Sequence, residues 1–298
     1  MFPLATPVAL SRCATCGLVF QQTPALVEFA QAESCYAERN LAHRRELRPE
    51  LLAQARRRLQ WLRRYVSAGA RVLEVGGATG EFAFEATRLG WHVTLLELSA
   101  PFVAEARAVY GLDARRELLT AESFPPGTFD GIVLFHLLEH LPRPGDFLDS
   151  AWRLLRPRGI LALIVPNLDS ITDRIFRRWA TSLRMPDHLF HFNAATLRRL
   201  LNSHGYEVID LVTAEPPHHL WTSTYALGGL VRRAYSGSRG SGSSPMDQVS
   251  ERVSLARLPF TLARLTAPLT WFYRRWADAT GRGHEVLCVA RRREPSRA

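Results

Sequence analysis

Arg71-Val-Leu-Glu-Val-Gly-Gly-Ala-Thr-Gly80 joins an apolar strand to a glycine-rich turn, and a helix-like run follows it over residues 81–89. Glycine has no Cβ and tolerates a positive φ. Gly76, Gly77 and Gly80 therefore allow a tight reversal of the chain and the close approach of a ligand to bare backbone at a helix N-terminus. The segment predicts a ligand-binding turn between a buried strand and a helix.

A second apolar run, Trp91-His-Val-Thr-Leu-Leu96, is followed by Glu97. An acid about twenty residues beyond such a turn accepts hydrogen bonds from a ribose diol in a doubly wound sheet. The spacing of Gly76 and Gly80 differs from the G-x-G-x-x-G pattern of dinucleotide-binding turns, and no Lys-Ser or Lys-Thr pair follows as in a phosphate-binding loop. The two runs together predict a nucleoside cofactor that is not held through phosphates.

Residues 73–80 resemble motif I of the class I S-adenosylmethionine-dependent methyltransferases, whose usual form is acid-x-Gly-x-Gly-x-Gly. Ala78 stands where the middle glycine of that motif usually lies, and this exchange leaves room for a methyl group. Glu97 matches the acid that binds the ribose hydroxyls in the family. Residues 127–141 are similar to its fourth strand and the loop after it, and the resemblance extends over roughly residues 65 to 212.

The resemblance implies S-adenosyl-L-methionine as the cofactor and an enzyme that transfers its methyl group. The residues expected to bind the cofactor lie in the glycine turn, after the second strand and in two later loops. They are Glu74, Gly76, Gly77, Ala78, Gly80, Glu97, Leu98, Glu122 and His136.

Strand-like and helix-like segments alternate from Arg71 onward, which is typical of a parallel sheet covered by helices on both faces. The predicted fold class is α/β, a Rossmann-like doubly wound and mostly parallel sheet. The resemblance adds an antiparallel last strand, expected at residues 285–290. The other strands are expected at 72–75, 92–96, 115–119, 131–135, 160–165 and 206–212, and the helices at 81–89, 100–110, 144–155 and 194–203.

The chain is predicted to divide into an N-terminal extension over residues 1–66, a cofactor-binding core over 67–212 and a C-terminal addition over 213–298. The extension ends in an amphipathic helix, residues 45–66, whose arginines are expected on a solvated face. The addition contains a flexible Gly- and Ser-rich loop at 236–244, followed by basic aromatic helices.

Histidines concentrate in two segments that follow predicted strands. His136 and His140 flank Glu139, and His188 and His191 lie further along the chain. Methyl transfer to a hydroxyl or an acidic carbon needs a base, and histidine titrates near neutrality. The resemblance points to His188 as base or acceptor-orienting residue, with His140 and His191 as further candidates. A helix over residues 171–183 is expected to form a lid on the substrate side.

Two alternatives remain open for the chemistry. Glu139, His140 and His188 resemble the ligands of a divalent metal in small-RNA 3′-terminal methyltransferases and some quinone-pathway O-methyltransferases. The same Leu-Glu-His-Leu run is widespread in family members with no metal, so no metal ligand is assigned. The other alternative is a non-catalytic protein that keeps the cofactor-binding fold, which the exchange at Ala78 and the incomplete ribbon-like segment at the N-terminus leave open.

Cys13 and Cys16 form a Cys-x-x-Cys pair, which supplies only half of a tetrahedral zinc site. The segment resembles the second knuckle of a small zinc ribbon found before the methyltransferase domain in a group of bacterial small-molecule methyltransferases. A truncated start, a ribbon that has lost its metal, and completion of the site by Cys35 and a histidine such as His43 are the alternatives. A redox role is disfavoured, because no thioredoxin-like pattern surrounds the pair.

The composition suits a globular enzyme: 298 residues, 47% hydrophobic and 22% charged, suffice for a sizeable core. The net charge of +10 comes mostly from arginine and indicates attraction to anionic partners, although arginine-rich codon usage gives the same count. No nucleic-acid recognition module accompanies the charge. A small-molecule acceptor is therefore expected, such as a sugar or a cell-envelope precursor.

The sequence shows no secretory signal and no apolar window long enough to cross a membrane, so a cytoplasmic location is expected. The basic aromatic stretch at residues 255–276 has three interpretations. Packing of a helix onto the domain is the first. Peripheral contact with an anionic membrane through Trp271, Phe272 and Trp276 is the second. Nucleic-acid binding is the third and is least favoured.

Overall fold

The computed structural model describes residues 9–22, 40–176, 187–216 and 265–294. The chain forms two compact units, each assembled from segments that are distant in the sequence. The larger unit comprises residues 25–165, 195–211 and 287–298, and the smaller unit comprises residues 1–24, 166–194 and 212–286. The predicted loop at 236–244 and the stretch from 251 to 264 lie outside the described residues.

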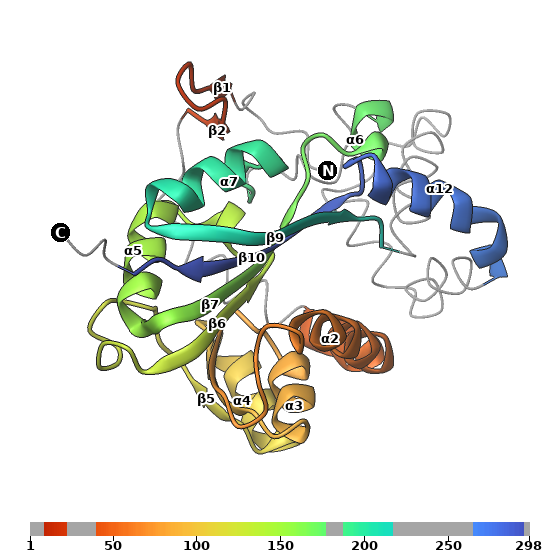
Figure 1. The fold of residues 1–298 in the computed structure, drawn as a ribbon. Coiled ribbons are helices and arrows are strands. Elements are labelled where there is room, and N and C mark those ends of the chain that lie inside the picture. The colour runs from red at the N-terminus through yellow and green to blue at the C-terminus, as the bar shows by residue number, and fades with distance from the viewer. Residues whose placement is uncertain (1–8, 23–39, 177–186, 217–264, 295–298) are drawn as a thin grey trace, which may run out of the picture. The chain divides into compact units, whose positions relative to one another are not determined.

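The larger unit is built on a seven-stranded sheet in the order β5-β4-β3-β6-β7-β10-β9 (Figure 1). Neighbouring strands from β5 to β7 pair in parallel, whereas the arrows of β9 and β10 point in opposite directions (Figure 1). The predicted fold class is therefore confirmed. The strands are β3 (Arg71–Val75), β4 (His92–Leu96), β5 (Asp113–Arg115), β6 (Phe129–Phe135), β7 (Leu155–Pro166), β9 (Tyr206–Ala214) and β10 (Glu285–Arg292).

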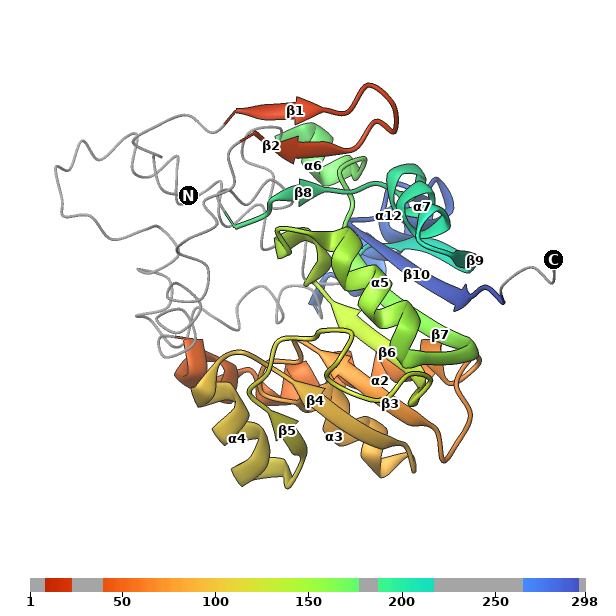
Figure 2. The same cartoon turned by 90° about the vertical axis from the view of Figure 1, so that its left-hand side faces the viewer.

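Helices cover both faces of this sheet, with α5 on one face and α2 and α3 on the other (Figure 2). Local signals fix their ends: the Ser99 hydroxyl accepts a hydrogen bond from the Phe102 N–H at the start of α4, and Gly111 ends that helix at φ 65°. The helices are α2 (Arg48–Leu62), α3 (Glu81–Arg88), α4 (Ala100–Tyr110), α5 (Pro144–Leu154) and α7 (Ala194–Ser203).

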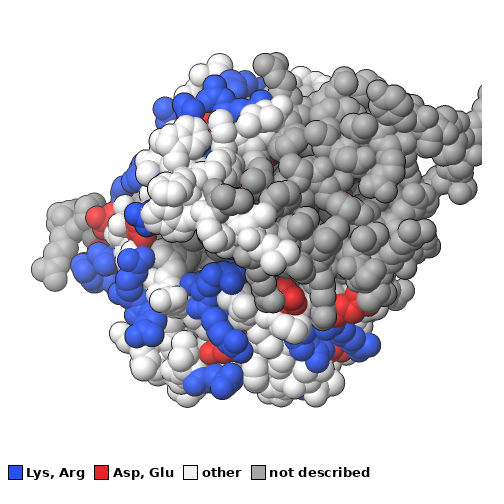
Figure 3. Space-filling model, turned by 90° about the vertical axis from the view of Figure 1, so that its right-hand side faces the viewer, with Lys and Arg blue, Asp and Glu red and all other residues white. Residues whose placement is uncertain are grey.

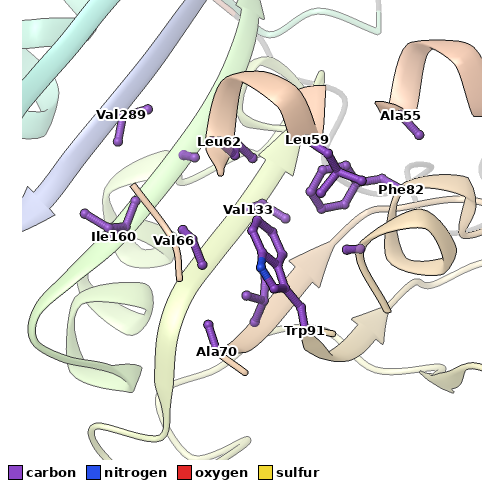
Figure 4. Packing of buried hydrophobic residues seen from close by; sticks show 13 residues of the cluster. Ala55, Leu59, Leu62, Val66, Ala70, Phe82, Trp91, Val133, Ile160 and Val289 are labelled. Atoms are coloured by element: carbon purple, nitrogen blue, oxygen red, sulfur yellow. The ribbon is translucent and has the colours of Figure 1, made fainter. Parts of the chain in front are cut away.

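A hydrophobic cluster fixes α2 against α3 and the sheet (Figure 4). Helix α2 contributes Ala55, Leu59 and Leu62, whose spacing places them on one face of the helix. They meet Phe82 of α3 and Val133 of β6 in this cluster. The amphipathic helix predicted from the sequence is present, and its buried face anchors the N-terminal extension to the sheet.

The arginines in and just before α2 lie on a solvated face, as the sequence predicts, and they also pair with buried acids: the side chains of Arg45, Arg48 and Arg56 are 56%, 34% and 57% exposed. Arg45, just before the helix, and Arg48 both pair with the buried carboxylate of Glu105, at 2.6 and 2.7 Å. Arg56 pairs with Glu85 at 2.8 Å. Hydrogen bonds from Arg45 above all lower the pKa of Glu105. Acidic side chains lie beside several groups of basic ones on the face shown in Figure 3.

Two strands have a boundary that differs from the prediction by more than two residues. The strand expected at residues 115–119 is β5, which spans Asp113–Arg115, and residues 116–120 form no strand. Only Ala114 of β5 is buried, so a short edge strand gave a weak apolar signal. Strand β7 begins at Leu155, five residues before the predicted start at 160, although its exposed first part has the basic sequence Arg-Pro-Arg.

The smaller unit contains a three-stranded sheet of β1 (Leu10–Arg12), β2 (Val19–Gln21) and β8 (Phe190–His191). Both strand pairs are antiparallel. Its helices include α6 (Ile171–Phe176), the first part of the predicted lid, whose remainder lies outside the described residues, and α12 (Ala267–Ala279). In the part of the chain that the structure describes, no helix is long and apolar enough to cross a membrane.

Truncation of Leu59 should destabilise the larger unit, because this side chain is 2% exposed at the centre of the α2 cluster. We expect Leu59→Ala to lower the free energy of unfolding by about 2–5 kcal/mol, measured by urea denaturation. Leu118→Ala is the matched control, since Leu118 is 60% exposed and its truncation should cost less than about 0.5 kcal/mol. Equal losses in the two variants would contradict the assignment of the core.

Candidate cofactor site

The turn between β3 and α3 has the backbone geometry that its glycines predict. Gly76 and Gly80 have φ values of 73° and 84°. A Cβ at Gly77 would lie 2.5 Å from the Glu74 carboxyl carbon, and one at Gly80 would lie 2.6 Å from a methyl of Leu112. Gly76 and Gly80 therefore require glycine for their positive φ, and Gly77 and Gly80 require it because a Cβ would clash.

Ala78 adopts a left-handed backbone with a φ of 50°, which is uncommon for a residue with a Cβ. A left-handed conformation costs an alanine roughly 1–2 kcal/mol. At this position the alanine N–H donates a hydrogen bond to Oε2 of Glu97, at 2.9 Å. Alanine at the position of the middle glycine thus still adopts a left-handed conformation.

Glu97 lies after β4 and joins the turn to the next helix. Its Oε2 accepts the Ala78 N–H and its Oε1 accepts the Ser99 N–H, both at 2.9 Å. The residue is 8% exposed. A carboxylate offers about four acceptor positions, so two remain after these bonds. This acceptor capacity fits a ribose diol, as the sequence predicts for a nucleoside cofactor.

Glu74 lies beneath the turn and is 2% exposed. Its Oε2 accepts the Ala83 N–H in the first turn of α3, at 3.0 Å. Burial raises the pKa of its carboxyl to about 8, against the opposing effect of the Arg58 charge. Glu74 was predicted to bind the cofactor, and in this structure its carboxyl supports the turn from below.

Arg44 forms hydrogen bonds with side chains of the turn and was not identified from the sequence. It lies in the helical segment before α2. Its Nε donates to Oγ1 of Thr79 at 2.7 Å, and its Nη2 donates to Oε2 of Glu81 at 2.9 Å. The Thr79 hydroxyl donates to the other oxygen of Glu81 at 2.6 Å. These bonds connect the N-terminal extension directly to the predicted cofactor turn.

The loop after β6 approaches the glycine turn, as the sequence predicts. A Cβ at Gly76 would lie 3.1 Å from methyl carbons of Leu137. His136, just before, has a positive φ of 54°, and its Nδ1 lies 3.7 Å from Oε1 of the buried Glu139. The structure therefore brings His136 and Gly76 to the same edge of the sheet.

The remaining predicted cofactor residues have local partners. The Leu98 carbonyl accepts a hydrogen bond from Nε of Arg116 at 3.0 Å. Glu122 is exposed, and its N–H donates to Oγ1 of Thr120 at 3.3 Å. Their contacts with a cofactor stay predictions.

The predicted catalytic histidines divide between the two units. His140 ends a short 3-10 helix, Leu138–His140, in the larger unit. His188 and His191 belong to the smaller unit and are 7% and 4% exposed. The His188 carbonyl accepts a hydrogen bond from Nε2 of Gln21 at 2.8 Å. The catalytic roles of the three histidines stay predictions.

Cys13 and Cys16 lie in the turn that connects β1 and β2. The Cys13 N–H donates to the Leu18 carbonyl, and the Gly17 N–H donates to the Cys13 carbonyl, both at 2.9 Å. Hydrogen bonds from the backbone, with that of Cys16 the largest effect, lower the pKa of the Cys13 thiol. Cys35 lies outside the described residues, so zinc binding stays a prediction.

Comparisons with known proteins all find methyltransferases among the similar sequences. A protein family described as "Methyltransferase domain" matches residues 41–211, more than half of the chain. A relative in Mycolicibacterium smegmatis, named "Probable S-adenosylmethionine-dependent methyltransferase", is 33% identical over 48% of this chain and 54% of its own length. A "Ubiquinone biosynthesis O-methyltransferase" of Xanthomonas oryzae is 36% identical over 34% of this chain and 44% of its own length. The matched region thus spans about half the length of these relatives.

Solved structures share the fold. A SAM-dependent methyltransferase from Archaeoglobus fulgidus has a TM-score of 0.50 and 16% identity, and the match covers 80% of this chain and 94% of that one. The structure titled [4+2]-cyclase SpnF also has a TM-score of 0.50, with 18% identity over 80% of this chain and 81% of its own. At these identities the likeness extends to the fold alone.

Glu74 should make stability depend on pH. Its pKa is about 8 when folded, above the ordinary 4.5, so the folded protein keeps a proton that the unfolded chain releases between these values. This stabilisation is complete below about pH 4.5 and is lost as the pH rises to about 8. We expect Glu74→Gln to remove this decline, measured as the difference from wild type in urea denaturation across the range. Parallel profiles for the two proteins would contradict the assignment.

Proposed function

Because this chain belongs to the family of S-adenosylmethionine-dependent methyltransferases, we propose that it transfers a methyl group from that cofactor to an oxygen of a small-molecule acceptor. S-adenosyl-L-methionine is the cofactor of the family. The observation that carries the proposal is the pair of hydrogen bonds between Glu97 and the backbone at Ala78 and Ser99. It leaves a carboxylate with free acceptor positions beside a glycine turn.

The residues around the turn supply binding and orientation. When bound, the cofactor provides an electrophilic methyl group on a sulfonium, so alignment of the acceptor can supply much of the rate acceleration. Glu97 would hold the ribose hydroxyls, and the bare backbone at Gly76 and Gly77 would allow close approach of the cofactor. Arg44 and Glu74 would keep the turn in place from its two sides.

The acceptor is the finer part of the proposal. Relatives named O-methyltransferase support an oxygen, although they match only part of this chain. A sugar or a cell-envelope precursor would meet the requirement for a hydroxyl. We propose His188 as the base or the residue that orients this hydroxyl, with His140 and His191 as further candidates.

Loss of the Glu97 carboxylate should weaken cofactor binding. Hydrogen bonds to a charged group contribute about 1.5–3 kcal/mol each, so Glu97→Ala should raise the Kd for S-adenosylmethionine by about tenfold or more in calorimetry. Glu207→Ala, which removes an exposed acid of β9, is the control and should bind as wild type does. The site assignment fails if Glu97→Ala remains folded in thermal unfolding and binds the cofactor with unchanged affinity.

Replacement of His188 should separate the enzyme from a non-catalytic binding protein of the same fold. With labelled S-adenosylmethionine and a metabolite extract, we expect the wild type to methylate an acceptor and His188→Gln to do so about 10²–10⁴ times more slowly, with the same cofactor Kd. His204→Gln is the control, since His204 pairs with Asp149 in the larger unit. Cofactor binding by the wild type without transfer to any fraction of the extract would favour the non-catalytic alternative.

A further inference from the structure

One side of α12 exposes large aromatic side chains. Among the described residues, the strongly exposed large hydrophobic side chains include three aromatic rings, and all three belong to this helix. Trp271 is 49% exposed, Phe272 73% and Trp276 45%. Leu265, just before the helix, is 73% exposed. Helical spacing places Phe272 and Trp276 one turn apart, so these side chains form one surface, the aromatic face of α12 (Leu265, Trp271, Phe272, Arg275 and Trp276).

Other residues of α12 fix the helix within the smaller unit. Ala277 is fully buried. Nε of Arg274 donates to the Glu215 carbonyl at 3.0 Å, and the Glu215 N–H donates to Oδ1 of Asp278 at 2.7 Å. The Thr213 hydroxyl donates to the Asp278 carbonyl at 3.4 Å. These bonds hold the helix in one orientation, so the aromatic face points outward as a preformed surface.

The aromatic face is basic as well as apolar. The Arg275 guanidinium lies 5.6 Å from the centre of the Trp271 ring, and that of Arg282 lies 5.9 Å from the Trp276 ring. Asp278 is the acidic residue of α12. It lies two turns after Trp271, at the edge of the aromatic face, and its carboxylate accepts the hydrogen bond from the Glu215 N–H. The face therefore presents two arginines against its rings, and the carboxylate at its edge is already engaged by the Glu215 N–H.

We propose that the aromatic face of α12 binds the headgroup region of an anionic lipid membrane. Tryptophan and phenylalanine are stable at the boundary of headgroups and acyl chains, where arginine pairs with lipid phosphates. A 13-residue helix is about 20 Å long and can lie in the plane of the interface. The net charge of +10 adds long-range attraction to an anionic surface. Charge complementarity thus favours a lipid surface as the occupant.

Sedimentation of the full chain with vesicles tests the proposal. We expect binding to vesicles of phosphatidylcholine mixed with phosphatidylglycerol, weaker binding to phosphatidylcholine alone, and a decrease at high salt. The triple variant Trp271→Ala, Phe272→Ala, Trp276→Ala should lose binding at least tenfold, because each ring contributes apolar area to the interface. The matched control replaces three exposed apolar residues of the larger unit, Leu89→Ala, Val109→Ala and Leu118→Ala, and should bind as the wild type does.

A charge variant separates the role of arginine from that of the rings. Arg275→Gln should weaken binding to the anionic vesicles by about fivefold, whereas Arg143→Gln, an exposed arginine of the larger unit, should not. Thermal unfolding and cofactor binding should match wild type in every variant. If the triple variant is unfolded, Phe272→Ser alone replaces it, since Phe272 is 73% exposed.

Three results would overturn the proposal. The first is equal binding to both kinds of vesicle, and the second is equal loss in the aromatic and control variants. The third is a change of oligomeric state in size-exclusion chromatography by the aromatic variant together with unaltered vesicle binding. That last result would assign the aromatic face of α12 to a contact between protein chains.

Discussion

The carboxylate of Glu97 connects two strand ends of the sheet, and the predicted cofactor site depends on this connection. It accepts one N–H from Ala78 in the turn after β3 and one from Ser99 at the start of α4, each at 2.9 Å. Parallel strands β3 and β4 end at the same edge, so a single side chain reaches both loops. Ala78 has a left-handed backbone in this turn, and the hydrogen bond from its N–H to Glu97 offsets the local strain of that conformation.

The function follows from this site and not from the fold. The same fold is found in the structure titled [4+2]-cyclase SpnF, so the arrangement of strands by itself does not identify methyl transfer. What supports it is the set of groups around the turn: Glu97 beside it, Glu74 beneath it and Arg44 at its side. Each bonds to the same short segment, residues 78–83: Glu97 and Glu74 accept backbone N–H groups, and Arg44 donates to the side chains of Thr79 and Glu81. These bonds support one conformation of the turn without a ligand.

Local signals explain which parts of the structure were predictable from the sequence. The family, the cofactor and the fold class are confirmed. They were predictable because the glycine turn and Glu97, which carry the signal, are close in the chain. Helix α4 has the predicted bounds, because Ser99 and Gly111 mark its ends. Arg44 was missed because its partner Thr79 lies 35 residues away, and nothing local distinguishes it among 38 basic residues. The wrong position of β5 has the same origin, as pairing with β4 and not apolar sequence defines it.

The smaller unit gives the N-terminal hairpin a structural role that does not require a metal. The segment with His188 and His191 is held by β2: Val19 pairs with His191, and the Gln21 side chain binds the His188 carbonyl across 167 residues of sequence. The turn with Cys13 and Cys16 closes this hairpin, so it supports the histidine segment through β2 whether or not the thiols bind zinc. A metal would constrain the turn further. The Cys-x-x-Cys pair and the proposed base, separate in the sequence analysis, therefore adjoin one sheet: the pair lies in the turn between β1 and β2, and His188 lies two residues before β8.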